Sequence, residues 1–237
     1  MKAKPVRKLD PEGPLVENAA RIVRMRLDEM RSFAPAALHP EFADEQHDLR
    51  IAAKRLRYVL ETTGFCFGGP ADTARRRARD IQDVLGDLHD CDVMLPRVAN
   101  HVDRLRTEDA EAIREAADAG DGLDPALVAS APHRTAYRGL EVLAVHAQAK
   151  RALLFDRFVE LWSALERDRT WERLERAIER KLREARERRA AIERAEKAAR
   201  ELERAERAER DAAERARRAA DALAEARRAQ RGPTAPP

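Results

Sequence analysis

Apolar residues recur every three or four positions along most of the chain, which is the spacing that places them on one face of an α-helix. The spacing predicts four helices, over residues 15–33, 42–65, 72–106 and 133–166. Helices joined by short connections are typical of an antiparallel bundle. The pattern therefore predicts an all-α fold whose main part is an antiparallel four-helix bundle.

Prolines and glycines mark the expected breaks between these helices. Pro35 and Pro40 bracket the first loop. Pro96 is expected to kink or restart the third helix, because proline cannot donate the intrahelical hydrogen bond. A turn is expected over residues 120–122 (Gly-Asp-Gly), and residues 124–125 (Asp-Pro) suit a helix cap followed by proline at the first helical position.

After Thr170 the pattern changes, because large aliphatic residues become too rare for a continuous coiled-coil seam. Acidic residues repeatedly precede basic residues by four positions, an order that adds about 0.2–0.5 kcal/mol per pair to an isolated helix. Examples are Glu196/Arg200, Glu206/Arg210 and Glu214/Arg218. We interpret this region as one long charged helix standing free in solvent, with a weak coiled coil as the alternative. The expected segments are a lead-in (1–14), the helical bundle (15–166), the charged helix (167–231) and a disordered tail (232–237).

Composition agrees with helix, since 38% of the residues are charged, only 4% are aromatic and there are nine glycines. The net charge of +3 does not by itself indicate a polyanion partner. Residues 171–231 contain 20 Lys and Arg against 15 Asp and Glu, whereas residues 1–170 contain 27 against 29. An anion site in the bundle must therefore come from the local arrangement of its charges.

The chain contains no signal for secretion or for a membrane. No stretch approaches the ~20 apolar residues that span a bilayer, and the basic N-terminus lacks the apolar run of a signal peptide. Two cysteines, Cys66 and Cys91, do not make a disulfide framework. We therefore expect a cytoplasmic protein with both thiols reduced and no membrane partner.

The most informative segment is residues 46–61, with the sequence QHDLRIAAKRLRYVLE. At about 100° of rotation per residue, four basic or potentially basic side chains share an arc of about 80° on the predicted helix. These side chains are His47, Arg50, Lys54 and Arg57. The apolar residues of the segment occupy the neighbouring arc, so the basic stripe borders the core face instead of lying opposite it. A stripe in that position would line a groove.

Other helices carry further charged stripes. Arg21 and Arg24 lie beside the apolar face of the first helix, and Lys150 and Arg157 align on the fourth. On the third helix, Arg79 shares a stripe with the carboxylates of Asp80, Asp83, Asp87 and Asp90. We expect helices one, two and four to supply cations while the third helix holds some of them in place. Two alternatives stay open: the basic stripe is simply ion-paired with those carboxylates, and His47 is a capping or surface histidine.

No metal, cofactor or catalytic centre is expected. Residues 89–92 (His-Asp-Cys-Asp) superficially suggest a metal site, but their side chains diverge on a helix. Asp92 is instead expected to point toward the core and pair with a donor from another helix. Nothing resembles a glycine-rich phosphate loop, and no acidic metal triad converges with the basic stripe. We therefore expect a binding protein and not an enzyme.

Two motifs resemble those of the CHAD domain, a helical module named for its histidines. The first is a His-x-x-Arg-x-x-x-Lys-Arg-Leu-Arg helix that starts at His47, and the second is the Leu-Gly-x-x-His-Asp segment that starts at Leu85. The resemblance covers residues 15–165 and implies binding of inorganic polyphosphate through basic side chains, with recruitment to polyphosphate granules. Only one copy of the motif pair is present, whereas the usual domain consists of two related halves. Either the chain is a half-sized variant, or two chains pair as a homodimer to complete the groove.

From these observations we expect a polyphosphate-binding helical bundle. The binding residues are predicted to be His47, Arg50, Lys54, Arg55, Arg57, Arg24, Arg21, Arg79, Lys150 and Arg157. The alternative is a structural or scaffolding protein that assembles through its long charged helix. Nucleic-acid binding also stays open, although the bundle lacks the aromatic platforms on which single strands stack.

Overall fold

The computed structural model describes residue 3, residues 5–117 and residues 124–230, except the side chains of 228–230. Within these ranges the chain forms helices and no strand, which confirms the all-α class. The elements are α1 (Leu15–Ala37), α2 (Ala43–Thr63), η1 (Gly64–Cys66), α3 (Gly69–Ala116), η2 (Pro125–Ser130), α4 (Ala136–Arg167) and α5 (Thr170–Gln230). The turn predicted at residues 120–122 and the tail predicted at 232–237 lie outside the described residues.

Two prolines lie inside helices where breaks were predicted. Pro35 belongs to the last turn of α1, so the first loop begins after Ala37. Pro96 lies inside α3, which runs from Gly69 to Ala116 without restarting. Proline removes one backbone hydrogen bond, but the buried face of α3 continues beyond it through Val98 and Leu105, and this packing favours one continuous helix. The cap predicted at residues 124–125 is confirmed, since the Asp124 carboxylate accepts a hydrogen bond from the backbone N–H of Ala126.

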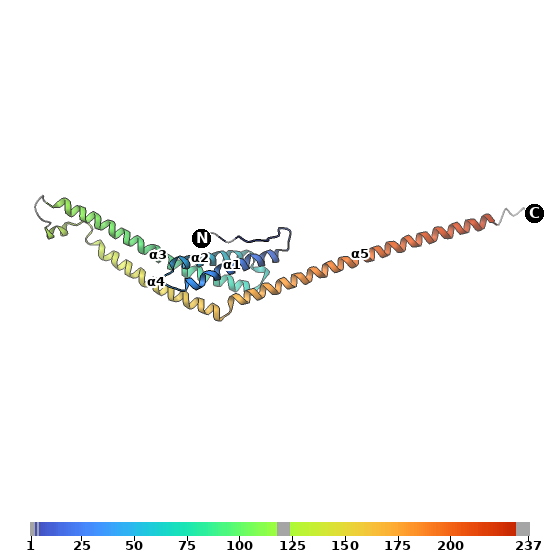
Figure 1. Ribbon diagram of the computed structural model, residues 1–237, viewed down its shortest axis with the longest axis horizontal. Coiled ribbons are helices and arrows are strands. Elements are labelled where there is room, and N and C mark those ends of the chain that lie inside the picture. The colour runs from blue at the N-terminus through green and yellow to red at the C-terminus, as the bar shows by residue number, and fades with distance from the viewer. Residues whose placement is uncertain (1–2, 4, 118–123, 231–237) are drawn as a thin grey trace, which may run out of the picture. The chain divides into compact units, whose positions relative to one another are not determined.

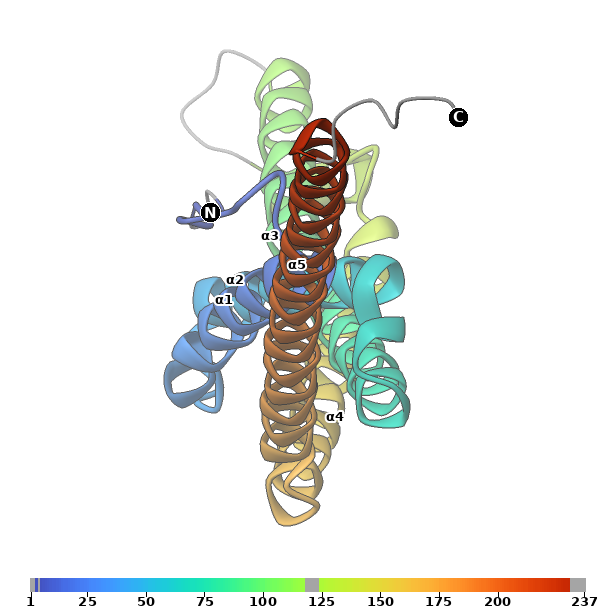
Figure 2. The same cartoon turned by 90° about the vertical axis from the view of Figure 1, so that its right-hand side faces the viewer.

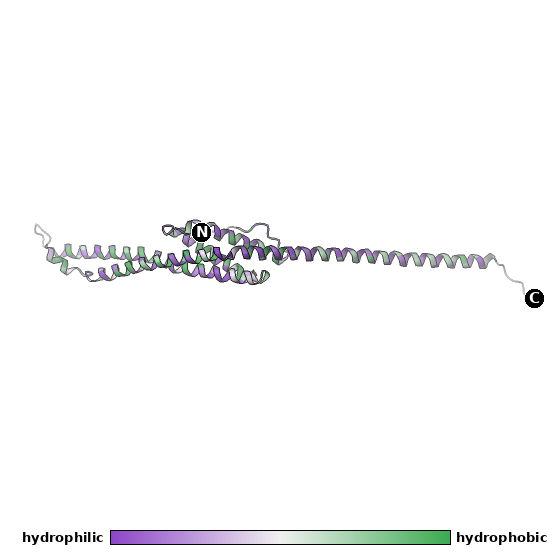
Figure 3. Ribbon diagram, turned by 90° about the horizontal axis from the view of Figure 1, so that it is seen from below, coloured by the Kyte–Doolittle hydropathy of each residue, from purple (hydrophilic) through white to green (hydrophobic). Residues whose placement is uncertain are grey.

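The chain divides into two compact units, residues 1–182 and residues 183–237. The second unit is the continuation of α5, and residues 186–227 are all exposed. Purple, hydrophilic segments recur along its whole length (Figure 3). Ion pairs one turn apart support this helix, among them Arg189–Glu193, Glu196–Arg200, Lys197–Glu201, Glu206–Arg210 and Glu214–Arg218. The choice between a free helix and a weak coiled coil remains a prediction.

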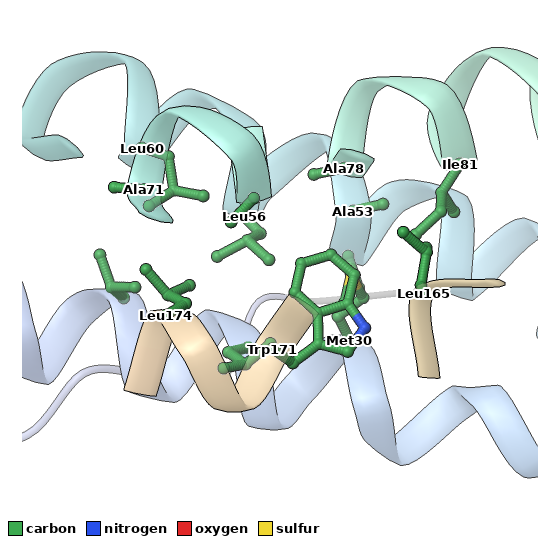
Figure 4. Packing of buried hydrophobic residues seen from close by; sticks show 14 of the residues in the cluster. Met30, Ala53, Leu56, Leu60, Ala71, Ala78, Ile81, Leu165, Trp171 and Leu174 are labelled. Carbon is green, nitrogen blue, oxygen red and sulfur yellow. The ribbon is translucent and has the colours of Figure 1, made fainter. Parts of the chain in front are cut away.

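In the first unit, α1 and α2 lie side by side (Figure 1; Figure 2). They pack against the first part of α3 and the last part of α4, and these two helices form a much longer pair. The main core takes buried side chains from all three of α1, α2 and α3, and from the end of α4. It also includes the first turns of α5, where Trp171, Leu174 and Ile178 are buried. Figure 4 shows Trp171 and Leu174 near Leu56 and Leu60 of α2. The core thus contains a fifth helical segment in addition to those of α1 to α4. The compact unit therefore extends past residue 166 to Leu182.

Beyond this core, α3 and α4 continue as a two-helix hairpin. Asp109 of α3 is buried there and accepts hydrogen bonds from the backbone N–H of His133 at 2.9 Å and from the Tyr137 hydroxyl at 2.8 Å. Both acceptor oxygens of this carboxylate therefore have a partner, which offsets the cost of burying it. The network fixes the end of α3 against the start of α4.

Candidate anion-binding site

The predicted basic stripe of α2 lies along the edge of the buried face of that helix. Its core face, which contains Leu49, Ala52, Ala53, Leu56 and Leu60, is buried. His47, Arg50 and Arg57 are half-buried beside that face, and Lys54 is exposed. The stripe therefore lies where the helical spacing predicted it, along the edge of the core. Such a position removes part of the surrounding water and strengthens the field of each charge.

The neighbour of this stripe is α3, which contacts it in two places. The rings of His47 and His89 have their centroids 4.3 Å apart. One turn further along α2, the Arg50 side chain crosses Gly86, where an added Cβ would lie 3.4 Å from the Arg50 Nε. A larger side chain at position 86 would occupy the volume of the Arg50 guanidinium. The glycine of the second motif thus makes room for the arginine of the first.

One face of α3 continues this contact along the helix. At about 100° per residue, Arg75, Gln82, Gly86 and His89 fall within an arc of about 60°, with Arg79 at its edge. Arg75 and Gln82 are half-buried, as expected for side chains on this contact face. The carboxylates of the acidic stripe lie about 100–180° from His89 on the same helix, away from α2. We call the two facing rows the α2–α3 seam; it comprises His47, Arg50, Lys54, Arg57, Arg75, Arg79, Gln82 and His89.

The cations of α2 in the seam are not neutralised by α3. Among the described residues, neither Arg50 nor Lys54 forms an ion pair with a carboxylate. Arg57 has one carboxylate neighbour, Glu61 on its own helix, with 3.8 Å between Nε and Oε1. The alternative that the α3 carboxylates hold the stripe is therefore wrong, because the rotation of α3 turns its aspartates away from α2.

Several polar atoms in the seam are buried and lack a hydrogen-bond partner. They are His47 Nδ1, Arg50 Nε, Arg57 Nε and Gln82 Oε1. A buried polar atom without a partner costs about 1–3 kcal/mol, so such a cluster is expected where water or a ligand completes the contacts. Three of these atoms are ring or guanidinium nitrogens, which can donate to an anion.

A tyrosine orders the outer end of the stripe. The Arg57 Cζ lies 4.6 Å from the centroid of the Tyr58 ring, and the Lys54 Nζ lies 5.8 Å from it. Cation–π contact at these distances favours conformations in which both cationic groups stay near the ring. The half-exposed Tyr58 therefore holds Lys54 and Arg57 close to each other at the surface.

The environment of His47 lowers the pKa of its ring below the ordinary histidine value. Burial is the largest cause, followed by the neighbouring His89 and the positive charge of Arg50, while Asp48 acts in the opposite direction. The His47 ring therefore takes up a proton less readily than an ordinary histidine before any anion binds. A bound anion would raise this pKa again, because it would offset the positive charge of Arg50.

Residues 2–99 match the family model of the CHAD domain. The match confirms the predicted family over this segment, which contains α1, α2 and both motifs. No curated protein and no solved structure matches the chain. We refer to residues 2–99 as the CHAD segment. Within it lie all eight residues of the α2–α3 seam.

Three predicted cations of the CHAD segment have partners elsewhere. Arg55 lies on the other side of α2 and contacts the buried carboxylate of Glu29 on α1 at 3.1 Å. Arg24 lies 3.7 Å from Glu179 at the beginning of α5. Arg21 donates a hydrogen bond to the backbone carbonyl of Lys8 and lies near Glu17 of its own helix. These three side chains connect elements of the fold, and none of them joins the seam.

The remaining predicted cations are exposed. Arg79 is at the edge of the seam and contacts Asp83 at 3.4 Å. Lys150 of α4 lies near enough to Cys91 to influence that thiol, on the side of α3 where Asp87 and Asp90 are found. Arg157 is exposed about two turns further along α4. The structure therefore places His47, Arg50, Lys54 and Arg57 on one stripe of α2, with Arg79 at the edge of the facing row of α3, whereas Lys150 and Arg157 lie on α4.

The cluster at residues 89–92 separates as expected. Asp92 accepts a hydrogen bond from the Arg151 Nε of α4, and the same guanidinium reaches Gln46 at 3.2 Å. This confirms the inter-helix donor predicted for Asp92. Burial raises the pKa of the Cys91 thiol, which keeps it protonated. In the part of the chain that the structure describes, no three His, Cys, Asp or Glu side chains form a group able to hold a metal ion, and no helix is long and apolar enough to cross a membrane.

Three seam residues were not among the predicted binding residues. His89 was matched only as part of the second motif, and neither Arg75 nor Gln82 was singled out. All three residues share one face of α3 at spacings of seven residues, so a helical wheel of α3 places them together. The sequence alone does not show that this face of α3, and not the aspartate stripe, contacts α2.

Proposed function

We propose that the protein binds inorganic polyphosphate along the α2–α3 seam and is not an enzyme. CHAD domains are associated with polyphosphate binding in general. The observation that carries the proposal for this chain is the lack of carboxylate partners around Arg50 and Lys54, next to buried donors of His47 and Arg57 that have no acceptor. Side chains arranged in this way are prepared for an anion that the chain itself does not supply.

The shape of the seam suits a linear polyanion better than a compact one. His47 and Arg57 are ten residues apart on α2, which corresponds to about 15 Å along the helix axis. Several phosphates of an extended chain fit beside that length. Arginine suits this task, because its planar guanidinium can donate two parallel hydrogen bonds to one phosphate group. Most of the affinity is expected to come from release of counterions.

The cations outside the seam have a weaker role in this proposal. Arg21, Arg24 and Arg55 are held by other groups, and Lys150 and Arg157 lie on another helix, so they add to the positive field without gripping the ligand. Binding of this kind would recruit the protein to polyphosphate granules. Pairing of two copies belongs to the proposal as well, since the CHAD segment contains the motif pair once.

Titration of the full chain with long-chain polyphosphate tests this function directly. We expect binding that weakens steeply between about 50 and 200 mM salt, as counterion release requires, and that double-stranded DNA competes poorly. No binding at low salt would overturn the proposal. Equal competition by DNA would replace it with a general polyanion site, and a flat salt response would indicate a shaped pocket for a small ligand.

A further inference from the structure

The side of α4 that faces away from the core carries an exposed apolar row. On a helical wheel centred on Ala149, the row and its charged ends fall within about 40° on either side. Its members are Arg138, Val142, Val145, Ala149, Leu153, Asp156 and Glu160, which we call the outer face of α4. The buried residues Ala147, Leu154 and Phe158 lie on the opposite side of the helix. α4 runs along the lower edge of the first unit in Figure 1.

The apolar members of this face are unusually exposed. Val142 is 62% exposed, Val145 59% and Leu153 53%. Single exposed aliphatic residues are common, but three in one row on the same helix face mark a surface that another element covers. Among the described residues, the charged ends of the row, Arg138 and Glu160, form no ion pair. Within residues 5–117 and 124–227, both the apolar and the charged parts of this face therefore lack a partner.

The order of residues along the outer face makes it complementary to itself in one orientation. When two copies of α4 run antiparallel and cross at Ala149, each residue faces the one equally far from Ala149 in the other copy. Val145 then faces Leu153 of the second copy, and Arg138 faces Glu160 of the second copy. Val142 faces Asp156 of the second copy, so the apolar contact is confined to the Val145 and Leu153 pairs around Ala149. At the flanks, Glu141 faces Arg157 of the second copy. A parallel pair would instead place Arg138 against Arg138 and Glu160 against Glu160.

From this pattern we propose that the protein forms an antiparallel homodimer through the outer face of α4, with a two-fold axis at Ala149. Small residues at the crossing point, Ala149 and Ala152, allow the two helices to approach closely. Each contact occurs twice, as a two-fold axis requires. The proposed occupant of the face is thus a second copy, because the charges at its ends match the reversed sequence of the same helix.

This inference assigns a surface to the pairing of two copies that the proposed function includes, but the dimer contact itself does not depend on polyphosphate. The α2–α3 seam is formed by other helices, so a protein that dimerises without binding polyphosphate, or binds it as a monomer, would separate the two proposals. One helix pair is a small interface, which is typical of weak association. The association is therefore measured on the full chain at about 10–100 µM protein, without polyphosphate.

Sedimentation equilibrium of the full chain and of charge variants tests the surface and its orientation. We expect a dimer for the wild type, and at least about tenfold weaker association for Val145→Glu and for Leu153→Glu. Because both side chains are exposed, circular dichroism should show unchanged helicity. Arg138→Glu and Glu160→Arg should each weaken the dimer, and the double variant Arg138→Glu/Glu160→Arg should restore it, since the pair is only reversed.

Leu202→Glu is the matched control, because Leu202 is also an exposed aliphatic residue but lies in the second unit. We expect it to leave the dimer intact. A wild-type monomer at every concentration would overturn the proposal. So would a dimer that Leu202→Glu dissociates and Val145→Glu does not, or a double charge reversal that fails to restore what the single reversals weaken.

Discussion

The second unit contains 16 Lys and Arg and the α2–α3 seam contains five, and the two regions arrange these cations in opposite ways. In the second unit, arginines and lysines alternate with glutamates one turn away, and side chains such as those of Arg210 and Glu206 are 82% and 54% exposed. In the seam, Arg50 and Lys54 lack such partners, and the stripe borders the buried face of α2. The basic excess of the chain belongs to the second unit, but several of its cations are paired with a glutamate one turn away.

The difference shows that an anion site depends on how charges are placed and not on how many there are. A cation paired at i,i+4 in open solvent has its field cancelled nearby and screened by salt. A cation at the edge of a core has less water around it, so it interacts more strongly with any anion that approaches. We therefore expect the balanced first unit to be the better polyphosphate binder of the two.

The strongest test of this comparison reverses two charges of the seam. Arg50→Glu with Arg57→Glu should weaken polyphosphate binding by at least about 100-fold, because each arginine contributes about 1.5–3 kcal/mol through charged hydrogen bonds and each new carboxylate repels the ligand. Isothermal titration calorimetry measures the loss. Circular dichroism checks that the fold is intact, and Lys54→Glu, at an exposed position, gives a second variant whose folding is not at risk.

The matched control reverses the same number of charges in the second unit. Arg188→Glu with Arg207→Glu changes two exposed arginines and gives the same change in net charge. We expect an effect of no more than about threefold, from the weaker overall field. Equal losses in the two double variants would mean that net charge, and not the seam, determines binding.

Acidification should tighten binding through His47. The pKa of its ring is lowered in the free protein by burial, His89 and Arg50, and a bound polyanion opposes the last of these causes. The complex therefore binds a proton more strongly than the free protein, so affinity should rise as the pH falls from about 8 through 6.5 to 5.5. We expect a gain of about tenfold over this range, and a smaller gain for His47→Gln. A pH dependence identical in both proteins would remove His47 from the site.

Glu61→Gln should improve binding by a few fold. Glu61 lies at the end of the seam and is the carboxylate neighbour of Arg57. Removing its charge frees the guanidinium and also removes a repulsion of roughly 0.5–1 kcal/mol at a half-exposed position. Glu193→Gln in the second unit, which frees Arg189 in the same way, is the control and should have no measurable effect. Weaker binding by Glu61→Gln would indicate that Glu61 positions Arg57 for the ligand.

The sequence predicted the helices and the basic stripe of α2 because both depend on the spacing of residues within one helix. His47, Arg50, Lys54 and Arg57 lie where the rotation of about 100° per residue places them. Pro96 did not restart the third helix, since packing of α3 on both sides of it outweighs the loss of one hydrogen bond.

The choice of partners could not be predicted in this way. Arg55 is adjacent in sequence to Lys54, yet it points toward α1 and is held by the buried Glu29. Likewise, Trp171 belongs to a segment whose sequence predicts a charged helix in solvent. It lies in the core because the chain reverses direction at Arg169 (φ 50°), so that the first turns of α5 pack against the bundle. Such contacts depend on how helices are oriented around one another, and a single helical wheel does not contain that information.

The most direct test of the account is a polyphosphate titration of a chain that ends at Leu182. This end point keeps Trp171, Leu174 and Ile178 of the core and removes the second unit. The shortened chain should remain helical and bind long-chain polyphosphate within about twofold of the full chain, although its formal net charge falls from +3 (47 − 44) to −1 (31 − 32). Loss of most of the affinity from a folded shortened chain would contradict the account, because it would place the polyphosphate site in the charged helix and not in the α2–α3 seam.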